Sequence, residues 1–130
     1  MIIYQSSKAG FIHDVDQNAL SPRLQSAFMA KTGSVPSDSR VWADEYSRFS
    51  TALRNAAVED DIQVAIEYHI SAAGRFRIDV LLAGNDGTTD NGVIVELKAW
   101  DTAGFSTIIA LVHSPIGGGT LKQHPCVQAR

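Results

Sequence analysis

Three acidic residues and one lysine fall on apolar, strand-like segments of the sequence, where charged side chains are costly. Glu67 lies in VAIEYHI, Asp79 lies in RIDVLL, and Glu96 and Lys98 lie in GVIVELKAW. Side chains of a strand alternate between its faces, so Glu96 and Lys98 project on the same side. Burying an acid and a base is expensive unless they pair with each other or hold a metal ion. The segments therefore predict a charged cluster on one face of a sheet.

The chemistry open to such a cluster is metal-assisted hydrolysis. Neighbouring carboxylates cannot all ionise comfortably without a cation, and Mg²⁺ or Mn²⁺ prefers oxygen ligands. Such an ion activates water against a phosphodiester. Lys98 would orient or help deprotonate that water and stabilise the charged transition state. Antiparallel strands can bring Glu67, Asp79 and Glu96 together on one face, in a register that the sequence does not specify.

Helices are predicted in the first part of the chain, over about residues 1–58. Ile2–Tyr4 forms either a short strand or an apolar anchor, and Ser6 or Ser7 caps a helix that follows. The dipeptide Ser21-Pro22 predicts the start of a second helix, which would bury Leu24, Phe28 and Met29 and end at Gly33. A third helix is predicted by helical spacing of Trp42, Tyr46, Phe49, Leu53 and Ala56.

The apolar period changes to two after Asp61, which predicts a sheet over about residues 61–113. Three strands are expected at residues 62–70, 75–83 and 92–100, and a further short strand at 107–112. Residues 84–92 are rich in Gly, Asn and Asp and predict a turn. Helices followed by a meander indicate an α+β class, with N-terminal helices packed on a three- to four-stranded, mainly antiparallel sheet.

The pattern of Asp79 followed by Glu96-Leu97-Lys98 resembles the Asp…Glu-x-Lys signature of the PD-(D/E)XK nuclease superfamily. That signature alone is common by chance, but the sequence segments around it make the resemblance more specific. These segments are MIIYQSSKAGFI, VAIEYHI, RIDVLLAG, VIVELKAW, GGG and HPCVQA. Together they are similar to the nuclease-like N-terminal region of bacterial proteins in which a helicase-type ATPase follows. The resemblance covers nearly the whole chain, residues 1–130, as a single domain.

The resemblance implies a role for each matching residue. Asp79 and Glu96 would be the metal-binding acids, Glu67 an additional acidic ligand and Lys98 the catalytic lysine, with Mg²⁺ or Mn²⁺ as cofactor and nucleic acid as substrate. Gln128 resembles the glutamine that opens the following helix in some members and helps to organise the site. Glu45 on the third helix is a further acid of the kind that some of these nucleases place there.

The sequence departs from the family pattern in two ways. It has no Walker motif, so the ATPase is missing, and the closing helix begins at about residues 124–130 without being completed. Either the chain is an excised or shortened domain, or a small protein keeps the front half of the fold. In the second case, the open sheet edge would invite a protein partner or a second copy of the chain to complete the sheet.

Composition limits the setting and the partners. The formal net charge of −3 argues against binding nucleic acid through bulk electrostatics. No apolar run approaches the roughly 20 residues that span a bilayer, and no signal peptide is evident at the N-terminus. A single cysteine, Cys126, cannot form an internal disulfide, which predicts a reducing, cytoplasmic setting.

Each candidate residue also has a plainer explanation. Glu96 and Lys98 would then be a surface ion pair at a strand end, Asp79 would pair with Arg75 or Arg77, and Glu67 would face solvent. The alternative function is a non-catalytic protein that binds a partner on the same fold, such as an anti-CRISPR-like inhibitor of phage or mobile-element origin. Small size, an acidic pI and the missing closing elements favour that alternative.

Overall fold

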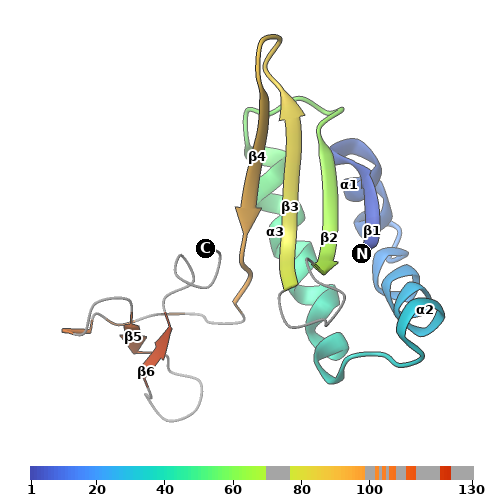
Figure 1. Ribbon diagram of the computed structural model, residues 1–130, viewed down its shortest axis with the longest axis vertical. Coiled ribbons are helices and arrows are strands. Elements are labelled where there is room, and N and C mark those ends of the chain that lie inside the picture. Colours follow the sequence, from blue (N-terminus) through green and yellow to red (C-terminus); the bar gives the residue numbers. More distant parts are fainter. Residues whose placement is uncertain are drawn as a thin grey trace. The chain divides into compact units, whose positions relative to one another are not determined.

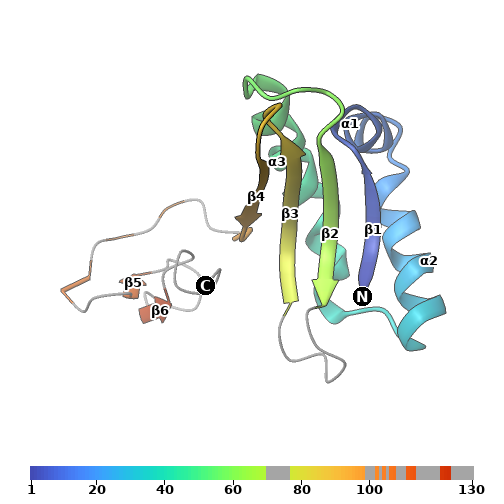
Figure 2. The same ribbon diagram turned by 45° about the horizontal axis from the view of Figure 1, so that its top comes forward.

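The computed structural model describes residues 1–69, 77–98, 102, 104, 106, 107, 111–113 and 121–123. The chain divides into two compact units, residues 1–95 and 96–130, and each is described by itself. In the first unit, helices lie on one side of an antiparallel sheet with strand order β1-β2-β3-β4 (Figures 1 and 2). This confirms the α+β prediction. Among the described residues, no helix is long and apolar enough to cross a membrane.

The elements of the first unit follow a simple order along the chain. They are β1 (Ile2–Ser7), α1 (Lys8–Asp16), α2 (Leu20–Thr32), the 3₁₀ helix η1 (Ser37–Val41), α3 (Trp42–Asn55), β2 (Gln63–His69), β3 (Arg77–Asn85) and β4 (Asp90–Val95). In the second unit, β5 (Leu111–His113) pairs antiparallel with β6 (Leu121–Gln123).

Most of the predicted helix signals are confirmed. The Ser7 side chain accepts a hydrogen bond from the Gly10 backbone N–H and so caps α1. Gly33 ends α2 in the left-handed conformation, with φ of 75°, which favours glycine. Trp42, Tyr46 and Leu53 form the buried stripe of α3, as their spacing predicts.

The predicted start of the second helix is wrong. The helix α2 begins at Leu20, and Ala19 precedes it without a side-chain cap, so Ser21 lies inside the first turn. Leu20 is almost fully buried, and its burial in the core outweighs the capping preference of Ser21. Met29 is exposed rather than buried.

The core lies between the helices and the sheet. Val64, Ile66 and Val80 are fully buried, and Ile66 and Val80 are direct partners in the β2–β3 ladder. The aromatic ring of Phe28 stacks on that of Trp42, with the ring centroids 5.3 Å apart. This contact packs the beginning of α3 against α2.

The β3–β4 register is fixed at the turn that joins these strands. The Asp86 carboxylate accepts hydrogen bonds from the backbone N–H groups of Thr88 and Thr89, at 3.0 and 2.8 Å, and Gly87 adopts a positive φ. The Thr88 hydroxyl also donates to this carboxylate, at 2.7 Å. This bond first, and then the two backbone bonds, lower the pKa of Asp86. A defined turn sets the pairing of the strands that leave it, and here it pairs Val80 with Val95.

The strand boundaries differ from the prediction at the third strand. The strand β4 ends at Val95, so Glu96, Leu97 and Lys98 follow it in irregular structure rather than lying within it. The apolar run that suggested a longer strand reflects local side-chain type, whereas a strand also needs backbone pairing. Residues 70–76, 99, 100 and 124–130 lie outside the described part of the chain, and with them the predicted turn at 71–74, Arg75, Trp100 and Gln128.

Candidate functional site

Glu67 is a buried carboxylate in the middle of the sheet. Its residue is only 2% exposed, which shows that the solvent-facing alternative for Glu67 is wrong. Its φ of 55° is unusual for a residue other than glycine and costs on the order of 1–3 kcal/mol. This backbone conformation interrupts the regular alternation of β2 and re-aims the side chain, a departure that the period-two pattern could not predict.

Two side chains from other elements approach the Glu67 carboxylate. The hydroxyl of Tyr46 on α3 donates a long hydrogen bond of 3.5 Å to Oε1, and Arg77 on β3 places Nε 2.9 Å from Oε2. Despite that ion pair, Oε2 is buried and accepts no well-directed hydrogen bond from any described residue. The charge of Glu67 is therefore partly balanced, while one oxygen keeps unused capacity as an acceptor or ligand.

The electrostatic surroundings disfavour a charged Glu67. Desolvation by burial raises its pKa to about 7; Arg77 opposes that shift, and the negative charges of Asp79 and Asp38 add to it. The pKa of Tyr46 is raised as well, by burial first and then by Glu67 and Asp79, with Glu45 contributing. Burial and the neighbouring carboxylates therefore outweigh Arg77 in setting the pKa of Glu67.

Asp79 stands across the ladder from Glu67. It lies between Ile78 and Val80, which pair with Tyr68 and Ile66 respectively, so the register sets Asp79 opposite Glu67. Asp79 is half-buried, and its charge raises the pKa values of both Glu67 and Arg77. The structure thus brings together two of the predicted metal-binding acids.

Arg77 links Glu67 to η1, the 3₁₀ helix that precedes α3. Its Nη2 donates to Asp38 Oδ2 of η1 at 3.2 Å while its Nε faces Glu67. Burial lowers the pKa of Arg77, but Glu67, Asp38 and Asp79 together outweigh that effect and raise it. The sequence suggests Arg77 as a partner of Asp79. It does not indicate the contact of Arg77 with Asp38, because Asp38 lies in a polar connector without a periodic pattern.

Glu96 and Lys98 form an ion pair in the second unit. Lys98 Nζ lies 2.5 Å from Glu96 Oε1, and the two side chains are 25% and 14% exposed. The contact fits the prediction that the two side chains share a side, and it also fits the plainer explanation of an ion pair beyond a strand end. Among the described residues, no group of three or more His, Cys, Asp or Glu side chains is arranged to hold a metal ion.

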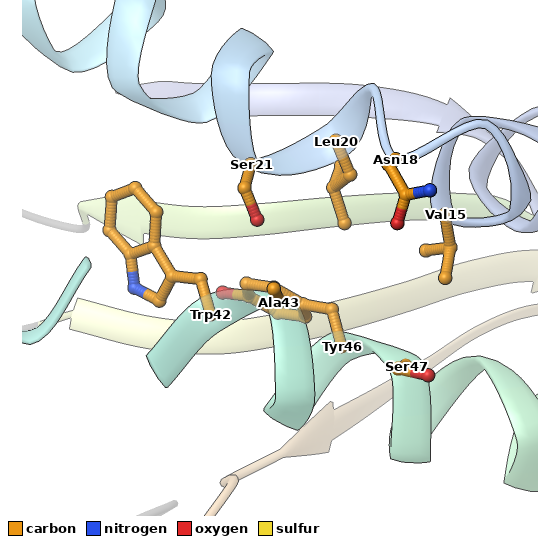
Figure 3. Close-up of a pocket in the computed structure, with 8 residues that line it drawn as sticks. All are labelled: Val15, Asn18, Leu20, Ser21, Trp42, Ala43, Tyr46 and Ser47. Atoms are coloured by element: carbon orange, nitrogen blue, oxygen red, sulfur yellow. The ribbon is translucent and has the colours of Figure 1, made fainter. Parts of the chain in front are cut away.

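A pocket of about 180 Å³ opens between α2 and α3 (Figure 3). Its lining is neutral at physiological pH and consists of Val15, Asn18, Leu20, Ser21, Trp42, Ala43, Tyr46 and Ser47. It offers no carboxylate, so it does not supply the acidic ligands that a hard cation requires. Tyr46 contributes to both the pocket and the surroundings of Glu67.

In comparisons with known proteins, no family model, curated protein or solved structure matches the chain.

Proposed function

We propose that this chain is a PD-(D/E)XK-type, metal-dependent nuclease-like domain that hydrolyses nucleic-acid phosphodiesters with Mg²⁺ or Mn²⁺. The observation that carries the proposal is the buried Glu67 carboxylate, whose Oε2 lacks a hydrogen-bond donor among the described residues and which stands opposite Asp79. Two acids so placed repel each other, and a divalent cation would offset the repulsion. The unused acceptor capacity of Glu67 fits such a ligand.

The spacing of two of the candidate acids agrees with the register of the β3–β4 hairpin. Val80 pairs with Val95, so Asp79 and Glu96 have the same separation from the turn that joins these strands. β4 ends at Val95, and the role of Glu96 together with Asp79 and Glu67 therefore follows from the resemblance.

Each residue then has a chemical role. Asp79, Glu96 and Glu67 would hold the cation, which supplies Lewis-acid polarisation of the phosphoryl group and a lowered pKa of water. Lys98 would orient the attacking water and stabilise the negative charge that develops on the phosphoryl oxygens. Glu96 holds the Lys98 ammonium at 2.5 Å, and this contact would keep the lysine beside one of its proposed acidic partners. Gln128 would help to organise the site, in a position that follows from the resemblance alone.

The test is cleavage of labelled single- and double-stranded DNA and RNA with Mg²⁺ or Mn²⁺. Asp79→Asn, Glu96→Ala and Lys98→Ala should each abolish cutting. Glu59→Ala and Lys122→Ala, which remove exposed charges elsewhere, should leave it unchanged. Metal-dependent cutting that survives in Asp79→Asn and Glu96→Ala would contradict the assignment of these acids.

A second candidate function is supported by the exposure of β4. Its residues Asp90–Ile94 are exposed, with Val93 and Ile94 at 54% and 42%, and in the described part of the sheet β4 pairs with β3 alone. An apolar edge strand can pair with a strand of another chain. A non-catalytic protein of this kind, comparable to an anti-CRISPR-like inhibitor, would bind its partner stoichiometrically, and binding would be unchanged in Lys98→Ala.

A further inference from the structure

Arg77 holds the place beside Glu67 that a metal ion would need. Its Nε is 2.9 Å from Glu67 Oε2, the oxygen with unused acceptor capacity, and its charge is also coupled to Asp79. The Arg77 side chain is 35% exposed, whereas that of Glu67 is 3% exposed, so Arg77 is the member of the pair that is in contact with solvent. A cation arriving from solvent at Glu67 would therefore meet Arg77.

The same guanidinium has a second anchor. Asp38 of η1 accepts a hydrogen bond from Arg77 Nη2 at 3.2 Å, and the Asp38 side chain is 48% exposed. Arg77 thus spans a buried acid and an exposed acid at once. Release from Glu67 would leave the guanidinium with an acidic partner nearer to solvent, so displacement would not strand an unpaired positive charge.

We infer that Arg77 is a resident counter-ion which occupies the cation position between Glu67 and Asp79, and which a divalent metal must displace toward Asp38. This inference rests on the proposed metal-binding function and adds a residue that sets the metal affinity. The physical reason is that a divalent ion at Glu67 Oε2 would compete with Arg77 Nε, which lies 2.9 Å from the same oxygen, and that the two positive charges would repel each other. Arg77 would thereby balance the acids when no metal is bound and raise the metal concentration needed to load the site.

The inference predicts that removal of the arginine tightens metal binding. Mn²⁺ binding, measured by electron paramagnetic resonance at constant pH, should be about tenfold tighter in Arg77→Gln than in the wild-type chain. Arg77→Lys keeps the charge and should stay near the wild-type affinity. Arg40→Gln is the matched control, because it removes one exposed positive charge from the same short helix as Asp38. It should change the affinity less than twofold.

The outcomes separate this inference from the proposed function. If Asp79→Asn loses Mn²⁺ binding while Arg77→Gln equals or falls below the wild type, Arg77 does not compete with the metal and the inference fails alone. If neither the wild type nor Arg77→Gln binds Mn²⁺, both the inference and the proposed function fail. An equal gain in Arg40→Gln would attribute the effect to net charge and would also overturn the inference.

A second measurement follows metal binding in the wild-type chain itself. The Nε–H resonance of Arg77 can be assigned by its loss in a folded Arg77→Lys variant whose backbone amide spectrum is otherwise preserved. Saturating Mg²⁺ should shift it together with the Asp79 backbone amide, because the guanidinium leaves Glu67. An Arg77 resonance that stays in place while the Asp79 amide shifts would show that the metal binds beside an undisplaced arginine.

Discussion

Replacement of Glu67 by glutamine should change how the stability of the protein depends on pH. Burial raises the pKa of Glu67 from 4.5 to about 7, with Asp79 and Asp38 adding to the effect and Arg77 opposing it. Between these values the folded chain keeps a proton on Glu67 that the unfolded chain has lost. The free energy of unfolding must therefore fall as the pH rises through this window, and then level off above about pH 7.

The magnitude follows from the size of this pKa difference. Each pKa unit corresponds to about 1.36 kcal/mol, so ionisation of Glu67 removes about 3 kcal/mol over the full window. Between about pH 5 and 8, where part of the unfolded-state titration is already complete, about 2 to 3 kcal/mol of this loss remains. Glutamine has nearly the same shape and does not titrate, so Glu67→Gln should lack this part of the pH dependence.

The assay is urea unfolding followed by circular dichroism, at about pH 5, 6, 7 and 8, in buffer with a metal chelator. The quantity to compare is the free energy of unfolding of the wild type minus that of Glu67→Gln. It should decrease as the pH rises. Glu59→Gln, which changes an exposed acid, should show the wild-type slope. Equal slopes for the wild type and Glu67→Gln between pH 5 and 8 would refute the reasoning, because Glu67 would then not titrate in this range.

Two further predictions concern the packing that positions the site. Leu24→Ala on α2 removes a fully buried side chain, so it should lower the free energy of unfolding by about 2–5 kcal/mol in urea titrations; Gln25→Ala, on the exposed face, should change it by less than about 0.5 kcal/mol. Tyr4→Phe removes the hydroxyl that donates to buried Asp14 at 2.9 Å. It should cost about 1–2 kcal/mol, and a cost below about 0.3 kcal/mol would show that Arg23, at 2.7 Å, alone satisfies Asp14.

Periodicity predicts α3, β2 and β3 of the first unit, whereas the start of α2, the end of β4 and the place of β1 in the sheet do not follow from it. The stripe of α3 was predictable because Trp42, Tyr46 and Leu53 recur at helical spacing and are all buried. The strands β2 and β3 were predictable for the same reason at a period of two. Helix α2 begins at Leu20 because tertiary burial outweighs the local capping signal of Ser21, and single-sequence patterns do not contain that information.

The candidate site was predictable in its residue types and not in its detailed contacts. The low tolerance of apolar strands for acids singled out Glu67 and Asp79, and the pairing of Ile66 with Val80 and of Tyr68 with Ile78 gives the two acids matching positions on β2 and β3. The positive φ of Glu67 and the link from Arg77 to Asp38 depend on how η1 and α3 pack near the sheet. Such contacts join residues far apart in sequence, and no local pattern marks them.

The spacing of the Asp…Glu-x-Lys pattern gains physical meaning from the turn between β3 and β4. In an antiparallel hairpin, the sum of the residue numbers of paired residues is constant, and Val80 with Val95 sets that sum here. Asp79 and Glu96 have the same sum, so they are equidistant from the turn that Asp86 and Gly87 build. β4 ends at Val95, so Glu96 takes its place in the proposal from this spacing and from the resemblance. Loss of metal-dependent cutting in both Asp79→Asn and Glu96→Ala is the result that would support a shared role for these two acids.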